Sequence, residues 1–96
     1  MIYKIKVTFS VAQETRKLSP EIRKAAKAAL KDIAHNPHLG KELQAELSGF
    51  KSFRFNRYRI NYKTDQKLKY IIVWAIGHRR DVYEQLGEHL LQQKGG

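Results

Sequence analysis

Three arginines alternate with aromatic and aliphatic residues between Phe53 and Tyr62, in the run Phe-Arg-Phe-Asn-Arg-Tyr-Arg-Ile-Asn-Tyr. Because successive side chains of a β-strand point to opposite faces of the sheet, this run predicts strands with one apolar and one cationic face. The apolar face would hold Phe53, Phe55, Tyr58, Ile60 and Tyr62, and the other face Arg54, Arg57 and Arg59. Guanidinium groups stay protonated and hold phosphate oxygens through paired hydrogen bonds, so the pattern indicates a phosphate-binding surface.

A second polar group follows Gly77, directly after the longest apolar run of the chain. It comprises His78, Arg79, Arg80 and Tyr83. If the strand-like runs pair as consecutive hairpins, we expect this group to converge with Arg54 and Arg59. Tyr83 would then stack on a base or donate a hydrogen bond to the ligand.

Positive charge dominates the 96-residue chain, in which 19 basic and 9 acidic residues give a formal net charge of +10. Such a field attracts polyanions, so nucleic acid or an acidic protein is the expected partner. The excess is concentrated between Lys51 and Tyr83, and we assign Lys51, Arg57 and Arg80 to contacts with a nucleic-acid backbone.

Several other classes of site are not expected. The chain has no cysteine, which excludes disulfides, thiolate catalysis and thiolate metal sites. His35 and His38 flank Asn36-Pro37 without further nearby ligands, so no metal site is expected there. No apolar run is long enough to span a bilayer and the N-terminus lacks a signal-peptide pattern, so we expect a cytoplasmic protein without membrane contact.

The elements that must position these residues are expected to form one α+β domain over residues 1–96, with residues 92–96 as a disordered tail. An N-terminal strand is expected from Tyr3 to Phe9, where apolar residues alternate with lysines. A helical hairpin follows: a short helix capped by Ser10 that runs to Leu18, then an amphipathic helix capped by Ser19 that ends near His35, before Asn36-Pro37.

The second half predicts a three-stranded antiparallel meander and a short C-terminal helix. The strand-like runs cover residues 50–55, 58–64 and 68–76, after a connector at residues 39–49 with weak periodicity. The run from Tyr70 to Ile76 is apolar throughout, which indicates a strand covered on both faces. Val82, Leu86 and Leu90 would pack as one row of the final helix.

Four motifs, in this order and spacing, resemble the RelE/ParE superfamily of toxins from type II toxin–antitoxin systems, and most closely its RelE-like branch. They are Leu18-Ser19-Pro20-Glu21-Ile22, Asn36-Pro37-His38-Leu39-Gly40-Lys41, Tyr58-Arg59-Ile60-Asn61-Tyr62 and Ile76-Gly77-His78-Arg79-Arg80-Asp81-Val82-Tyr83. The resemblance implies a microbial-RNase-like fold in which a helical hairpin covers one sheet face and the other face is the basic site. It also implies a cognate antitoxin that holds the toxin inactive.

RelE-like members cleave messenger RNA in the ribosomal A site without a metal or cofactor, using the 2′-hydroxyl of the RNA as the nucleophile. Carried onto this chain, the resemblance assigns Arg59 and Arg79 to stabilisation of the phosphorane-like transition state, and Tyr83 to stacking or proton transfer. The best-known pattern also has two lysines on the first meander strand, at positions that here hold Ser52 and Arg54. Arg54 can supply charge but is a poor base, so His78 is the candidate proton acceptor.

Two alternatives stay open at the level of sequence. The ParE-like branch shares the fold and inhibits DNA gyrase without catalysis, which the absent lysines allow. A catalytically inactive RNA-binding homologue is the other possibility.

Overall fold

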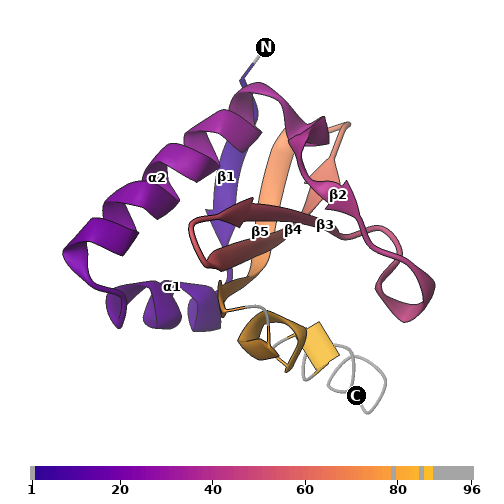
Figure 1. Ribbon diagram of the computed structural model, residues 1–96. Helices are drawn as coiled ribbons and strands as arrows, with labels where there is room; N and C mark the ends of the chain where they lie inside the picture. Colours follow the sequence, from indigo (N-terminus) through magenta and orange to yellow (C-terminus); the bar gives the residue numbers. More distant parts are fainter. Residues whose placement is uncertain (1, 79, 85, 88–96) are drawn as a thin grey trace.

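Five strands form one sheet in the computed structural model, which describes residues 2–78, 80–84 and 86–87 (Figure 1). The strand order is β1-β5-β4-β3-β2, with bounds β1 Lys4–Val7, β2 Lys41–Glu42, β3 Lys51–Phe55, β4 Tyr58–Asp65 and β5 Tyr70–His78. β1 pairs with β5 in parallel, and the other neighbours pair antiparallel. The predicted α+β fold, with its N-terminal strand, helical hairpin and meander, is confirmed.

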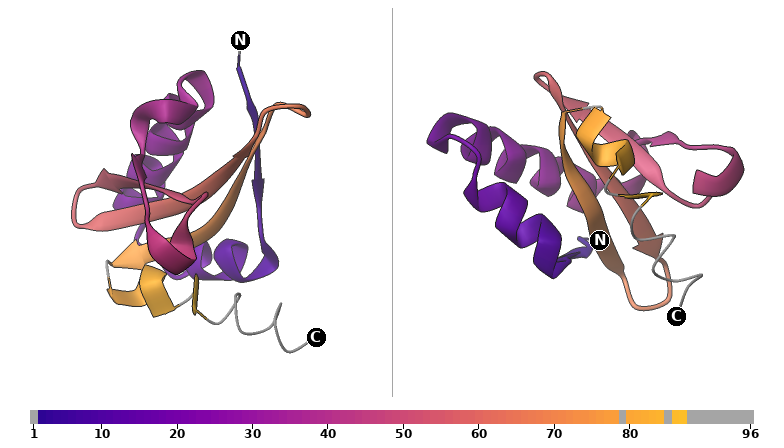
Figure 2. Two further views of the ribbon diagram at one scale, coloured as in Figure 1. Left: turned by 90° about the vertical axis from the view of Figure 1, so that its right-hand side faces the viewer. Right: turned by 90° about the horizontal axis from the view of Figure 1, so that it is seen from below.

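Both long helices lie on the same side of this sheet, as the right-hand view of Figure 2 shows. α1 (Phe9–Arg16) is capped by Thr8, two residues before the expected cap Ser10, because the Thr8 hydroxyl accepts the Val11 N–H. α2 (Pro20–His35) begins after Ser19, whose hydroxyl accepts the Ile22 N–H, and ends before Asn36 as expected. Among the described residues, no helix is long and apolar enough to cross a membrane.

The two faces of the sheet are covered differently. On the side of α1 and α2, here called the helix-side face, Phe55, Ile60 and Tyr62 are buried against Ala26, Ala29 and Ile33 of α2 in one apolar cluster. The opposite side, here called the basic face, carries a smaller cluster made by Phe50, Ala75, Val82 and Leu86. Residues 80–84 and 86–87 are helical, so the C-terminal helix packs on the basic face. Leu90 and the expected tail at residues 92–96 lie outside the described residues.

A β-bulge interrupts the pairing of β4 with β5. Asn61 pairs with Ala75 while Tyr62 pairs with Val73, so Trp74 is an extra residue on β5. Trp74 and Ala75 consequently both join the cluster on the basic face, although they are neighbours in sequence. Every residue of β5 after the bulge therefore lies on the face opposite to the one that simple alternation assigns.

The connector after α2 contains a short edge strand that the sequence pattern did not predict. Two 3₁₀ turns, Pro37–Leu39 and Ala45–Leu47, flank β2, which adds a fifth strand at the sheet edge. The buried Tyr62 hydroxyl donates to the Pro37 carbonyl at 2.7 Å and accepts the Gly40 N–H at 2.9 Å. These two bonds fasten the connector to the middle of the sheet.

Candidate functional site

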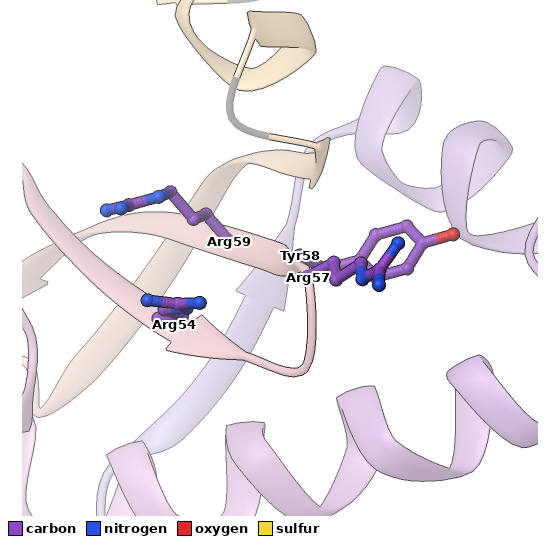
Figure 3. A pocket seen from close by; sticks show the side chains of 4 residues that line it. All are labelled: Arg54, Arg57, Tyr58 and Arg59. Carbon is purple, nitrogen blue, oxygen red and sulfur yellow. The ribbon is translucent and has the colours of Figure 1, made fainter.

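The β3–β4 hairpin brings two arginines directly opposite each other. Arg54 and Arg59 are paired residues of the antiparallel register, so their side chains leave the sheet on the same face. Figure 3 shows both guanidinium groups on one side of the hairpin. The hairpin closes through Asn56 and Arg57, and Asn56 takes a φ of 51°, a left-handed conformation that asparagine tolerates.

This arginine pair lacks an internal counter-ion. Within the described part of the chain the salt bridges are Lys17–Glu14 and Lys51–Glu42, so neither Arg54 nor Arg59 has a carboxylate within 4.0 Å. The Arg54 Nε–H donates to the Asn56 carbonyl, at 3.5 Å. Like charges placed directly opposite in a sheet are destabilising. Proteins keep unfavourable local arrangements of this kind mainly at functional sites. The pair is therefore poised to bind an anion.

An open cavity of about 250 Å³ adjoins the pair and is lined by Arg54, Arg57, Tyr58 and Arg59. Arg57 and Tyr58 point away from the two paired arginines, toward the side on which α1 and α2 lie (Figure 3). Arg57 is thus a turn residue at the end of the sheet. It does not belong to the cationic strand face, where the alternation had predicted it. The cavity offers positive charge on both sides of the hairpin end.

His78 does not reach the Arg54–Arg59 pair. It is paired with Tyr58 at the end of β5, and its imidazole stacks on the Tyr58 ring with the ring centroids 4.4 Å apart. Tyr58 packs on the helix-side cluster, so His78 lies on the face opposite Arg59. The expected convergence of His78 with the arginines is therefore wrong. The bulge at Trp74 reverses the side-chain alternation before His78 and turns its side chain to the helix-side face.

Lys51 is also absent from the basic face. It lies on the same side of β3 as Phe53 and Phe55, which is the helix-side face. Its Nζ lies 3.7 Å from the Glu42 carboxylate on the edge strand β2. The structure thus gives Lys51 an ion pair at the sheet edge, and its assignment to a nucleic-acid backbone contact stays a prediction.

The C-terminal residues are placed in part. Arg79 lies outside the described residues. Arg80 is exposed and Tyr83 half-buried in the helical residues 80–84, whose Val82 packs with Ala75 of β5. This helix is therefore on the same face as Arg54 and Arg59, and Figure 3 shows it on the Arg59 side of the hairpin.

Residues 5–87 match the sequence model of a family described as "ParE-like toxin of type II bacterial toxin-antitoxin system". The chain belongs to this family. The toxin is 31% identical to Toxin RelG of Mycobacterium tuberculosis over 87 residues, which cover 88% of this chain and 100% of that relative. The assignment to the RelE/ParE superfamily from the four motifs is confirmed.

Solved structures show the same fold. The RelBE2 toxin–antitoxin complex from Mycobacterium tuberculosis matches with a TM-score of 0.77 and 29% identity, covering 84% of this toxin and 95% of that chain. A mutant form of E. coli toxin RelE in the free state matches with a TM-score of 0.78 and 19% identity, covering 95% and 100%. The second likeness concerns the fold alone.

A buried polar pair beside the arginines was not predicted from the sequence. Ser52 and Asn61 face each other across β3 and β4, next to the Arg54–Arg59 pair and on the same face. Asn61 is 0% and Ser52 4% exposed, and neither side chain has a hydrogen-bond partner among the described residues. The signal in the sequence that could have indicated this pair is the position of Asn61 two residues after Arg59, which puts both side chains on one face of a strand. In the toxin these groups add a desolvation cost to the charge repulsion on the same face.

We expect Asn61→Leu to raise the free energy of unfolding by about 1 kcal/mol, because it removes an unpartnered buried amide at nearly constant volume. Urea denaturation monitored by Trp74 fluorescence measures this change. Asn61→Asp is the matched control, and it should destabilise the toxin because it buries a carboxylate. A clear loss of stability in Asn61→Leu would contradict the interpretation and show that Asn61 makes hydrogen bonds that stabilise the fold.

Proposed function

We propose that this toxin is a metal-independent endoribonuclease that cleaves messenger RNA on the ribosome and so stops translation. The observation that carries the proposal is the Arg54–Arg59 pair, which presents two guanidinium groups on one face without a carboxylate partner in the described chain. Fixed positive groups of this kind bind a phosphodiester and favour the transition state in which its oxygens gain charge. The net charge of +10 supports an RNA-rich target.

In the proposed reaction the 2′-hydroxyl of a bound nucleotide attacks the adjacent phosphorus. The O2′–P bond forms and the P–O5′ bond breaks, which leaves a 2′,3′-cyclic phosphate and a free 5′-hydroxyl. The proton leaves O2′ and a proton is delivered to O5′, so no redox step or external group is needed. Arg59 and Arg54 would hold the non-bridging oxygens in the phosphorane.

Proton transfer is assigned to the C-terminal segment in this proposal. His78 is stacked on Tyr58 on the opposite face, which argues against the expected role of His78 as the base for a phosphate held by Arg59. Tyr83 belongs to the helix on the basic face, and we propose it for stacking or proton transfer. Arg79, which lies outside the described residues, is proposed to stabilise the transition state with Arg59. We propose that Arg54 and Arg59 contribute charge stabilisation of the transition state.

Purified toxin added to ribosomes programmed with a defined message should cut the message in the A-site codon, and primer extension maps the cut. Intact message together with inhibited gyrase supercoiling would instead support the ParE-like alternative. Intact message with unaffected gyrase but retained RNA binding would support a catalytically inactive homologue. Either outcome would overturn the nuclease proposal.

The proposed partner is a cognate antitoxin with an acidic or amphipathic segment that covers the basic face. Similar chains in solved structures belong to toxin–antitoxin complexes, including the intact E. coli RelBE complex and an archaeal RelE–RelB complex from Pyrococcus horikoshii. An acidic segment would neutralise the Arg54–Arg59 pair and exclude RNA from it. Ribosomes as the target would place the action of the toxin in the cytoplasm.

A further inference from the structure

Three aromatic rings form a continuous stack at the end of the sheet. Phe55 and Tyr58 are stacked with ring centroids 5.7 Å apart and an interplanar angle of 23°. His78 continues the stack on Tyr58, at 4.4 Å and 27°. Exposure increases along the stack, since Phe55 is buried, Tyr58 is half-buried and His78 is exposed.

This stack has an exposed outer end next to strong positive charge. Tyr58 shares the cavity of about 250 Å³ with Arg54, Arg57 and Arg59. Arg57 is exposed at the turn between the two faces of the hairpin, and in the described chain it has no carboxylate within 4.0 Å. Aromatic rings beside a row of cations are the combination by which proteins hold single-stranded nucleic acid, with bases on the rings and phosphates on the cations.

We propose that His78 and Tyr58 form a base-stacking subsite for a nucleotide that flanks the phosphodiester held by Arg54 and Arg59. The proposal rests on the proposed nuclease function. Arg59 and Tyr58 are neighbours on β4 with side chains on opposite faces, and the sheet ends at the Asn56–Arg57 turn. A single RNA strand can therefore pass around the end of the hairpin, with a phosphate on the arginine pair, its backbone along Arg57 and a flanking base on His78.

The subsite gives His78 a role in recognition instead of proton transfer. A stacking ring needs a flat face and tolerates replacement of its nitrogens, whereas a proton acceptor does not. The two roles therefore make opposite predictions for His78→Phe, which keeps an aromatic ring and loses both nitrogens. His78→Ala removes the ring in either case.

The test uses ribosomes programmed with a message in which 2-aminopurine replaces, one at a time, the bases in and next to the A-site codon. A 2′-O-methyl group at the cut position blocks the reaction, so that fluorescence reports stacking alone. We expect quenching at one flanking position with the wild type and with His78→Phe, and about tenfold weaker binding at that position with His78→Ala. His38→Ala, which alters another exposed histidine, is the control and should behave as the wild type does.

Cleavage of the unmodified message by the same variants completes the test. Retained cleavage in His78→Phe, with quenching, supports the stacking subsite. Unchanged quenching in His78→Ala overturns the stacking subsite. A His78→Phe variant that quenches normally but cleaves as poorly as His78→Ala would overturn the assignment of His78 to recognition instead of proton transfer, because only the imidazole nitrogens are lost. If the wild type neither binds nor cleaves the programmed message, the nuclease proposal fails together with this inference; normal wild-type cleavage with unchanged quenching in His78→Ala refutes the inference alone.

Discussion

Arg59→Ala is expected to lower the rate of message cleavage by at least about 100-fold, as the loss of one preorganised oxyanion donor does in other enzymes. Arg59 is half-buried near the turn of the β3–β4 hairpin, opposite Arg54 and beside Gly77 of β5. Its backbone is therefore fixed by pairing with a strand on each side, in contrast to the exposed Arg57 at the turn. Single-turnover cleavage of programmed ribosomes measures the effect.

The same substitution should leave the fold intact or make it slightly more stable. Removal of one of two directly opposed like charges relieves a repulsion worth about 0.2–1 kcal/mol. A loss of activity with an unchanged or raised unfolding midpoint would thus show that Arg59 serves the reaction. Arg59→Lys separates charge from geometry, because lysine keeps the positive charge but cannot hold two phosphate oxygens through a planar fork.

Arg23→Ala is the matched control for the loss of one arginine charge. Arg23 is exposed on α2, which covers the helix-side face of the sheet. The variant should cleave within a few-fold of the wild type. Equal losses in Arg23→Ala and Arg59→Ala would mean that net charge alone governs the activity, and the assignment of the arginine pair as the active site would then be wrong.

Tyr62→Phe is expected to have the largest effect on stability among conservative substitutions in the core, a loss of about 1–3 kcal/mol in the free energy of unfolding. Tyr62 is 0% exposed, and its hydroxyl group bonds both the Pro37 carbonyl and the Gly40 N–H. Phenylalanine would keep the ring and leave both backbone groups without a partner in the interior. Urea denaturation measures the loss. Tyr70→Phe is the control, and because Tyr70 is only half-buried at the start of β5 it should change stability by less than about 0.5 kcal/mol.

The stability that Tyr62 supplies should also depend on alkaline pH. Burial raises the pKa of Tyr62 above its ordinary value of 10.0, and the hydrogen bond from Gly40 partly opposes this shift. Below this value the tyrosine is neutral in both folded and unfolded chains, so its contribution is fully present. As the pH rises above it the unfolded chain loses the proton first, and stability falls until the folded-state pKa is passed. The difference between wild type and Tyr62→Phe should therefore shrink as the pH is raised from about 9 to about 11, and a constant difference would contradict this account.

Gly40 belongs to the connector segment that the Tyr62 hydroxyl holds to the sheet. A Cβ added there would lie 2.6 Å from the Tyr62 hydroxyl oxygen and 2.9 Å from its Cε1. Gly40→Ala should therefore destabilise the toxin, and by less in the Tyr62→Phe background, where the first contact is gone. A double-mutant cycle measures this coupling. Additive losses would show that the connector and Tyr62 act independently.

Local sequence signals predicted much of the fold because they act over a few residues. Ser19 with Pro20 begins α2 and Asn36-Pro37 ends it, since hydroxyl caps and proline geometry need no distant partner. The alternation from Phe53 to Tyr62 correctly separated the apolar residues from Arg54 and Arg59. The family followed from four motifs and was confirmed by residues 5–87.

By itself, therefore, the sequence determined the helices, the meander and the presence of a cationic strand face. Only the tertiary structure decided which side chains share that face. The bulge at Trp74 arises from the pairing of β5 with β4, and β5 alone, apolar from Tyr70 to Ile76, carries no sign of it. Because a shift of one residue reverses the face of every later side chain, this one irregularity moved His78 away from Arg59 and onto Tyr58.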